Sequence, residues 1–210
     1  MQTLLSRIAT LLLVAGTGAG CGGGSGTGPG SDPSVLTALE VTPATATLFT
    51  VAPGNTVALS VVAKDQDGQA MSGLGSPTFS SDNTAIANVS SAGTVTAVAA
   101  GTATITASLT AGGVTETGTT TVTTRVPPAT AAVTAPELAF QPVTVDVQAG
   151  GVVTWTFPSI QHDVTFTSGG APANIPALQG GSASRTFPTN GTFGYRCSIH
   201  PPMTGAVHVH

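Results

Sequence analysis

The chain has 210 residues, which is enough for one or two domains. Its formal net charge is −4, and the five Lys and Arg residues are scattered, which excludes a basic surface for nucleic acid. Charged residues make up only 7%, but the positive mean hydropathy and the many β-branched residues favour a folded, strand-rich protein over a disordered one.

Residues 1–20 have the pattern of an export signal. Arg7 supplies one positive charge, residues 8–15 form an apolar core too short to span a bilayer, and small residues follow before Cys21. This ending resembles a bacterial lipoprotein signal, although Gly18 stands where Leu is usual. The resemblance implies that Cys21 becomes the lipidated first residue of the mature protein.

Residues 21–34 are rich in Gly and Ser, a composition typical of a flexible tether. We therefore expect an exported protein that its N-terminal lipid holds at a membrane, in the periplasm or at the cell surface. Ordinary cleavage after Ala19, which gives a soluble protein, is the alternative. Lipidation would leave Cys197 as a single thiol in an oxidising compartment, and metal ligation would explain why such a thiol persists.

Residues 35–123 are expected to form one β-rich domain. No helical periodicity follows the signal, and short alternating runs at residues 56–63, 94–98 and 102–108 are separated by turn-forming residues. Regularly spaced short strands of this kind are typical of β-sandwiches and barrels.

This segment resembles a group 2 bacterial immunoglobulin-like domain. The resemblance is carried by Leu39-Glu-Val-Thr-Pro43, Phe79-Ser-Ser-Asp-Asn83, Ala87-Asn-Val-Ser-Ser-Ala-Gly93 and Val95-Thr-Ala-Val-Ala-Ala-Gly101. It implies an Ig-like β-sandwich of the kind that serves as a spacer or adhesion module in surface proteins. The segment contains no His or Cys, so we expect a mechanical role. Residues 124–130 contain two prolines and are expected to form a semi-rigid linker.

The loop from Cys197 to Met203 carries the strongest chemical signal in the chain. Cys197, His200 and Met203 follow one another at intervals of three, and His162 lies upstream at the start of an apolar alternating run. Such soft ligands suit copper far better than calcium, magnesium or manganese, and Cys plus two His with a weak axial Met is a blue-copper ligand set. Zinc also binds Cys and His, but Met is an unusual fourth zinc ligand.

Residues 131–210 resemble a cupredoxin of the plastocyanin, pseudoazurin and amicyanin type. The matching segments are Phe140-Gln-Pro-Val-Thr-Val-Asp-Val147, Ala149-Gly-Gly-Val-Val-Thr-Trp155, His162-Asp-Val-Thr-Phe166 and Gly191-Thr-Phe-Gly-Tyr-Arg-Cys197. The resemblance implies a Greek-key β-barrel or sandwich. The expected architecture of the whole chain is therefore all-β, with an N-terminal Ig-like β-sandwich followed by a cupredoxin domain.

The same resemblance assigns the site residues. It makes His162, Cys197 and His200 the equatorial ligands and Met203 the axial ligand of one type 1 copper ion per chain. Asp163 stands where relatives often have Asn; it would accept a backbone N–H near Ser198, keep the ligand loops in register and place a negative charge near the metal. The segment Phe157-Pro-Ser-Ile160 departs from the polar segment that is usual in the family.

These features predict an electron carrier rather than an enzyme. A filled blue-copper site leaves no open position for a substrate, and the sequence has no motif for nucleophilic hydrolysis or phosphate binding. We expect transfer through the edge of His200, ringed by Ile199, Pro201 and Pro202, to a transient redox protein partner, with no small-molecule substrate. The alternatives are a module for copper storage, delivery or resistance, and a surface adhesion or spacer protein whose cupredoxin domain is only structural.

Overall fold

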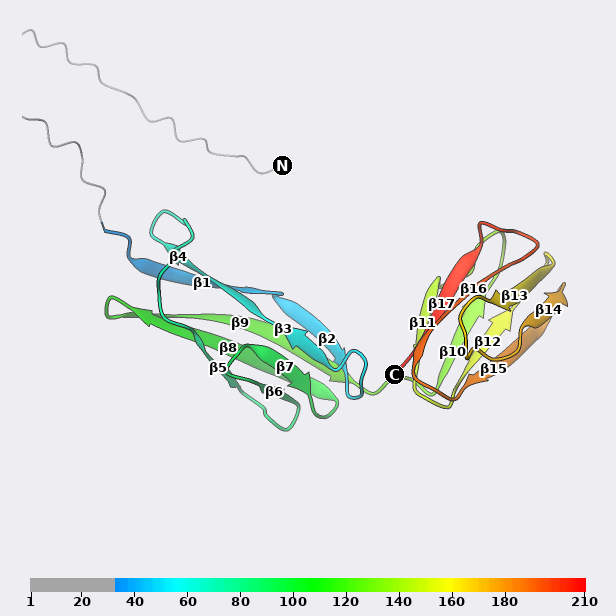
Figure 1. The fold of residues 1–210 in the computed structure, drawn as a ribbon, viewed down its shortest axis with the longest axis horizontal. Coiled ribbons are helices and arrows are strands. Elements are labelled where there is room, and N and C mark those ends of the chain that lie inside the picture. Colours follow the sequence, from blue (N-terminus) through cyan, green and yellow to red (C-terminus); the bar gives the residue numbers. More distant parts are fainter. Residues whose placement is uncertain (1–32) are drawn as a thin grey trace, which may run out of the picture. The chain divides into compact units, whose positions relative to one another are not determined.

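The computed structural model describes residues 33–210 (Figure 1). The expected signal at residues 1–20, the lipidation site Cys21 and most of the expected tether lie outside the described residues. Over residues 33–210 the structure contains strands and no helix. The same part of the chain therefore contains no helix able to cross a bilayer. The all-β prediction is confirmed.

The first group of strands lies between residues 36 and 125. It comprises β1 (Leu36–Thr42), β2 (Thr45–Phe49), β3 (Thr56–Ala58), β4 (Ser60–Asp65), β5 (Thr78–Ser81), β6 (Ala87–Val89), β7 (Thr94–Ala97), β8 (Gly101–Ala111) and β9 (Val114–Arg125). These strands form a four-stranded sheet in the order β2-β9-β8-β5, a three-stranded sheet β3-β7-β6 and the pair β1-β4.

The long hairpin β8–β9 shows how the sequence produces this arrangement. Ala111 pairs with Val114 across a two-residue turn, and Gly112 and Gly113 both adopt the positive φ that such a turn requires. Along β8 the buried residues alternate with half-buried Thr and Ser, as expected for a strand with one face on a core. Ile105 on this strand is fully buried in a cluster of small and branched side chains.

The second group of strands lies between residues 130 and 209, and residues 126–129 before it, inside the expected linker, are without strand. It comprises β10 (Thr130–Thr134), β11 (Thr144–Val147), β12 (Gly151–Thr156), β13 (His162–Phe166), β14 (Ile175–Leu178), β15 (Ser182–Phe187), β16 (Gly191–Arg196) and β17 (Thr204–Val209). They form two sheets, β10-β12-β15 and β11-β17-β16-β13-β14. The pairs β10–β12 and β11–β17 are parallel, whereas the other pairs are antiparallel.

One core, to which both sheets contribute side chains, fills the second group. Trp155 from the three-stranded sheet is fully buried and makes edge-on contacts with Phe166 and Tyr195 of the five-stranded sheet, with ring centroids 6.0 and 5.4 Å apart. Tyr195 in turn packs so closely on Gly205 that a Cβ there would lie 2.5 Å from the ring. Trp155 and Cys197 thus belong to one core, and the partly buried Phe166 packs against it.

Candidate metal centre

The strand register brings His162 to the loop that follows β16. Strand β13 pairs with β16 in antiparallel fashion, Thr165 opposite Arg196. Since His162 begins β13, this register places it near the loop that starts at Cys197 and contains His200. Residues distant in sequence are thereby held beside each other by a ladder of backbone hydrogen bonds.

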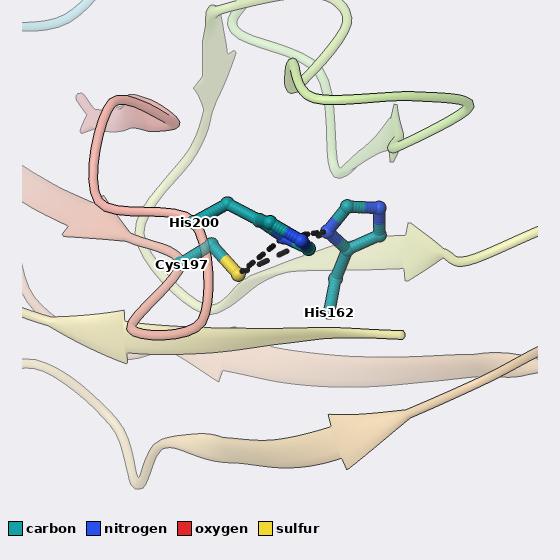
Figure 2. Close-up of side chains that lie close together, drawn as sticks. All are labelled: His162, Cys197 and His200. Carbon is teal, nitrogen blue, oxygen red and sulfur yellow. Dashed lines mark hydrogen bonds between the residues drawn. The ribbon is translucent and has the colours of Figure 1, made fainter. Parts of the chain in front are cut away.

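Three potential ligand atoms converge at this point, as Figure 2 shows. The Sγ of Cys197 lies 3.8 Å from Nδ1 of His162 and 3.6 Å from Nδ1 of His200, and the two Nδ1 atoms are 3.2 Å apart. Within residues 33–210 these side chains are the one group of three His, Cys, Asp or Glu residues whose ligand atoms all lie within 4.8 Å of one another.

The size of this triangle fits a metal ion. A point equidistant from three atoms with these separations lies about 2 Å from each, which is the range of metal–nitrogen and metal–thiolate bonds. In neutral imidazoles with the proton on Nε2, both Nδ1 lone pairs point at the same place as the sulfur, an arrangement that a cation stabilises. The residues present therefore fit the copper ion that the ligand types imply.

The centre is largely removed from solvent. His162 and Cys197 are 0% exposed, and His200 is only partly buried. Cys197 is a free cysteine. One ligand edge, that of His200, therefore reaches the surface, while the thiol and the first imidazole are enclosed by the core.

Met203 is held in the same loop by two backbone hydrogen bonds. Its N–H donates to the carbonyl of His200 over 2.9 Å, and its carbonyl accepts the N–H of Cys197 over 3.0 Å. Its side chain is 2% exposed and belongs to the core cluster that includes Cys197. The loop thus places a buried thioether in the same core cluster as the thiol, and the role of Met203 as axial ligand stays a prediction.

The surroundings of His162 oppose a positive charge on its ring. Burial lowers the pKa of His162, and the neighbouring His200 lowers it further, whereas Asp163 and the backbone of Glu137 act in the opposite direction; the net shift is downward. Its Nε2 is buried without a well-formed hydrogen bond. A lowered pKa keeps this imidazole unprotonated and available to a metal ion.

Asp163 joins the two ligand-bearing segments, as expected. Its Oδ1 accepts the backbone N–H of Ser198 over 2.6 Å, and its Oδ2 accepts the Ser198 hydroxyl and, over 3.4 Å, the hydroxyl of Thr165. Burial raises the pKa of Asp163, but hydrogen bonds from Ser198, together with Cys197 and Thr165, outweigh it and lower the pKa overall. The side chain is therefore held as a carboxylate beside the ligands.

Phe157 is a neighbour of the site that the sequence reasoning treated only as a departure from the family pattern. It is fully buried, and its ring centroid lies 6.2 Å from that of His162. The sequence does contain a pattern that indicates its burial, because Phe157 continues the alternation of buried residues at Val153 and Trp155.

The expected docking residues and the two C-terminal histidines lie outside the group of converging ligands. Ile199, which precedes His200, is 42% exposed, and Pro201 and Pro202, which follow it, are also exposed. In contrast, His208 and His210 approach Asp146, at 3.7 and 2.8 Å from its Oδ1, and are not members of the converging group. Ile199, Pro201 and Pro202, the expected docking residues, are thus accessible to a partner.

Comparison with known proteins matches the two parts of the chain separately. Residues 35–122 match the family model described as bacterial Ig-like domain (group 2). Residues 128–210 match the family model described as copper binding proteins, plastocyanin/azurin family. A chloroplastic plastocyanin of Tetradesmus obliquus is 35% identical over 77 residues, covering 30% of this chain and 51% of the relative, so the chain spans about half the length of that relative.

Solved structures give the same kind of match. A structure described as a novel purple cupredoxin from Nitrosopumilus maritimus is 26% identical, with a TM-score of 0.36, covering 38% of this chain and 99% of that one. A reduced amicyanin variant is 29% identical, also with a TM-score of 0.36, covering 39% of this chain and 82% of that one.

Proposed function

Since the chain joins a bacterial Ig-like domain to a copper-binding domain of the plastocyanin/azurin family, we propose that it carries single electrons between redox proteins outside the cytoplasm. The observation that supports this most directly is the convergence of one thiol and two imidazole Nδ1 atoms on a point about 2 Å from each. His162, Cys197 and His200 form the type 1 copper site of the domain.

Bound copper would supply a one-electron couple between Cu(II) and Cu(I). The contribution of the protein is to hold the ligands still. His162 is fixed by strand β13, and Cys197 follows strand β16 directly. The two backbone hydrogen bonds of Met203 close the loop from Cys197 to Met203. Pro201 and Pro202 restrict the backbone of that loop further. Ligands that move little between the two oxidation states keep the reorganisation energy of electron transfer small.

The burial pattern supports His200 as the residue through which electrons enter and leave the site. It is the one member of the converging group that is not fully enclosed, and exposed Ile199, Pro201 and Pro202 are its sequence neighbours. We propose that this apolar rim docks transiently on a redox protein. Residues 131–210 contain three acidic residues (Glu137, Asp146, Asp163) and two Arg (Arg185, Arg196), a formal net charge of 2 − 3 = −1, so we expect little electrostatic steering of that encounter.

We also propose that the protein is not an enzyme. With His162, Cys197, His200 and Met203 all used as ligands, no open coordination position is left for a substrate. The Ig-like domain would act as a spacer, which fits its lack of His and Cys.

The proposed location is a membrane surface outside the cytoplasm, through a lipid on Cys21. The short apolar segment and small residues before Cys21 support this part of the proposal. Replacement of Cys21 by Ser is expected to abolish labelling by a palmitate analogue and to release the protein from the membrane fraction. Unchanged labelling in the Cys21→Ser variant would contradict it.

The test of the electron-carrier function is exchange between oxidised and reduced protein. We expect mixed samples to show NMR line broadening from rapid electron exchange, while copper stays bound in the presence of an excess Cu(I) chelator. Absent exchange with rapid loss of copper to the chelator would favour storage or delivery instead. Failure to bind copper at all would favour a structural role for the domain.

A further inference from the structure

Asp163 is the buried charge nearest in sequence to the metal ligands. It follows His162 on strand β13, and its hydrogen-bond partner Ser198 follows Cys197. The Asp163 carboxylate thus contacts the residue that follows Cys197, and Asp163 itself is the chain neighbour of His162.

No cationic side chain balances this carboxylate within residues 33–210. It is 9% exposed, and the ion pairs of the described residues involve Glu40 and Asp146 but not Asp163. Hydrogen bonds from Ser198 and Thr165 are its partners. A buried charge is costly unless it is paired or lies beside a metal ion, and the converging ligand group is next to this one.

We propose that Asp163 sets the reduction potential of the centre, because its fixed charge favours a divalent ion over a monovalent one and so favours Cu(II) over Cu(I). This inference rests on the proposed function. With the Cys197 thiolate and the Asp163 carboxylate the ligand environment carries two negative charges. Uptake of one electron by Cu(II) then leaves the cluster with a net charge of −1 instead of zero, and a poorly solvated environment opposes that change.

The alternative is that Asp163 acts only as a clamp between the two ligand segments. An Asn at this position separates the two roles. Its amide oxygen can accept the Ser198 N–H, and its NH₂ group can donate to the Ser198 hydroxyl oxygen, so both hydrogen bonds are kept while the charge is removed.

Ser198 provides the opposite change. A Ser198→Ala variant keeps the charge of Asp163 and the backbone hydrogen bond but removes the hydroxyl that donates to Oδ2. With less of its charge compensated by a donor, the carboxylate then favours Cu(II) more strongly. Charge control therefore predicts potential shifts of opposite sign for the two variants. A clamp alone predicts a shift in Ser198→Ala but little or none in Asp163→Asn, because Asn keeps both hydrogen bonds to Ser198.

The first experiment is a redox titration of the copper-loaded full chain and its variants, followed by absorption. In Asp163→Asn the ratio of Cu(II) to Cu(I) at a fixed applied potential is expected to fall at least about tenfold, which is a rise of about 59 mV in potential. In Ser198→Ala the ratio is expected to rise. Asp146→Asn is the matched control. The Asp146 side chain is 39% exposed and lies opposite His208, a residue that is about 17 Å along strand β17 from Met203. The ratio of Cu(II) to Cu(I) should therefore change by less than about twofold in this variant.

A second readout does not depend on a blue-copper spectrum. For the metal-free full chain, the dissociation constant of Zn(II) divided by that of Ag(I) is expected to rise at least about tenfold in Asp163→Asn, because Zn(II) loses more from the missing charge. If the unmodified protein lacked a thiolate-to-copper band, the proposed function would fail while this ratio still decided the role of Asp163. Equal ratios in Asp163→Asn and Asp146→Asn, or potential shifts of the same sign in Asp163→Asn and Ser198→Ala, would overturn the inference.

Discussion

The fully buried imidazole of His162 makes the stability of the metal-free protein depend on pH. Burial and His200 lower its pKa below the ordinary value of 6.5, so the unfolded chain binds a proton there more readily than the folded chain. Stability is therefore complete above about pH 6.5 and falls as the pH drops from there toward the lower folded-state pKa. Urea unfolding between pH 7.5 and 5 is expected to show this decline, and His162→Gln to weaken it. An identical decline in the variant would contradict the assignment.

Tyr195 has the opposite dependence at high pH. Burial raises its pKa from 10.0 to about 12, and its hydroxyl has no hydrogen-bond partner of good geometry. The unfolded chain ionises first, so stability is expected to fall as the pH rises from about 10 toward 12. Tyr195→Phe keeps the ring contacts with Phe140 and Trp155 and should remove this decline. Denaturant unfolding at pH 9, 10 and 11 is the measurement; an equally steep loss in the Phe variant would show that another group is responsible.

The loop after β16 carries both metal ligands and the exposed residues Ile199, Pro201 and Pro202. Ile199 is 42% exposed, so replacing it by Asp changes the docking surface and leaves the core intact. We expect Ile199→Asp to slow electron exchange between copies of the protein at least about tenfold, because two like charges then meet at the contact. Val126→Asp, an exposed position in the linker, is the control. Equal rates in both variants, measured by NMR, would exclude Ile199 from the contact.

The elements also show how far the sequence leads. The Gly112-Gly113 turn, the alternation along β12 and the short spacing from Cys197 to Met203 are local patterns, and each could be read before the structure. The register of β13 on β16 could not, because it depends on which strands pair and not on either strand alone.

The side-chain contacts around the site could not be predicted from the sequence either. The Ser198 hydroxyl on Asp163 and the packing of Phe157 against His162 follow from how the loop folds back onto β13. The sequence suggested the backbone hydrogen bond of Asp163 only through the resemblance to a family. Contacts of this kind become visible when both ligand-bearing segments are placed in space.

For the molecule as a whole, the hydrophobic cores are confined to one domain each. The core around Trp155 contains only residues from 131 to 209, and the two clusters of the Ig-like domain contain only residues from 36 to 122. We therefore expect residues 128–210 to fold alone and to bind Cu(II) with the absorption spectrum of the full chain. A fragment that is unfolded by circular dichroism would show that the copper domain needs the Ig-like domain for its stability.

The proposed electron transfer depends on Cys197 binding copper as a thiolate together with His162 and His200. The most direct test is the visible absorption and EPR spectrum of the Cu(II)-loaded protein beside a Cys197→Ser variant. Thiolate ligation predicts an intense thiolate-to-copper charge-transfer band with narrow copper hyperfine splitting, both lost in the variant. A pale Cu(II) spectrum with ordinary hyperfine splitting, unchanged by the Cys197→Ser substitution, would contradict it.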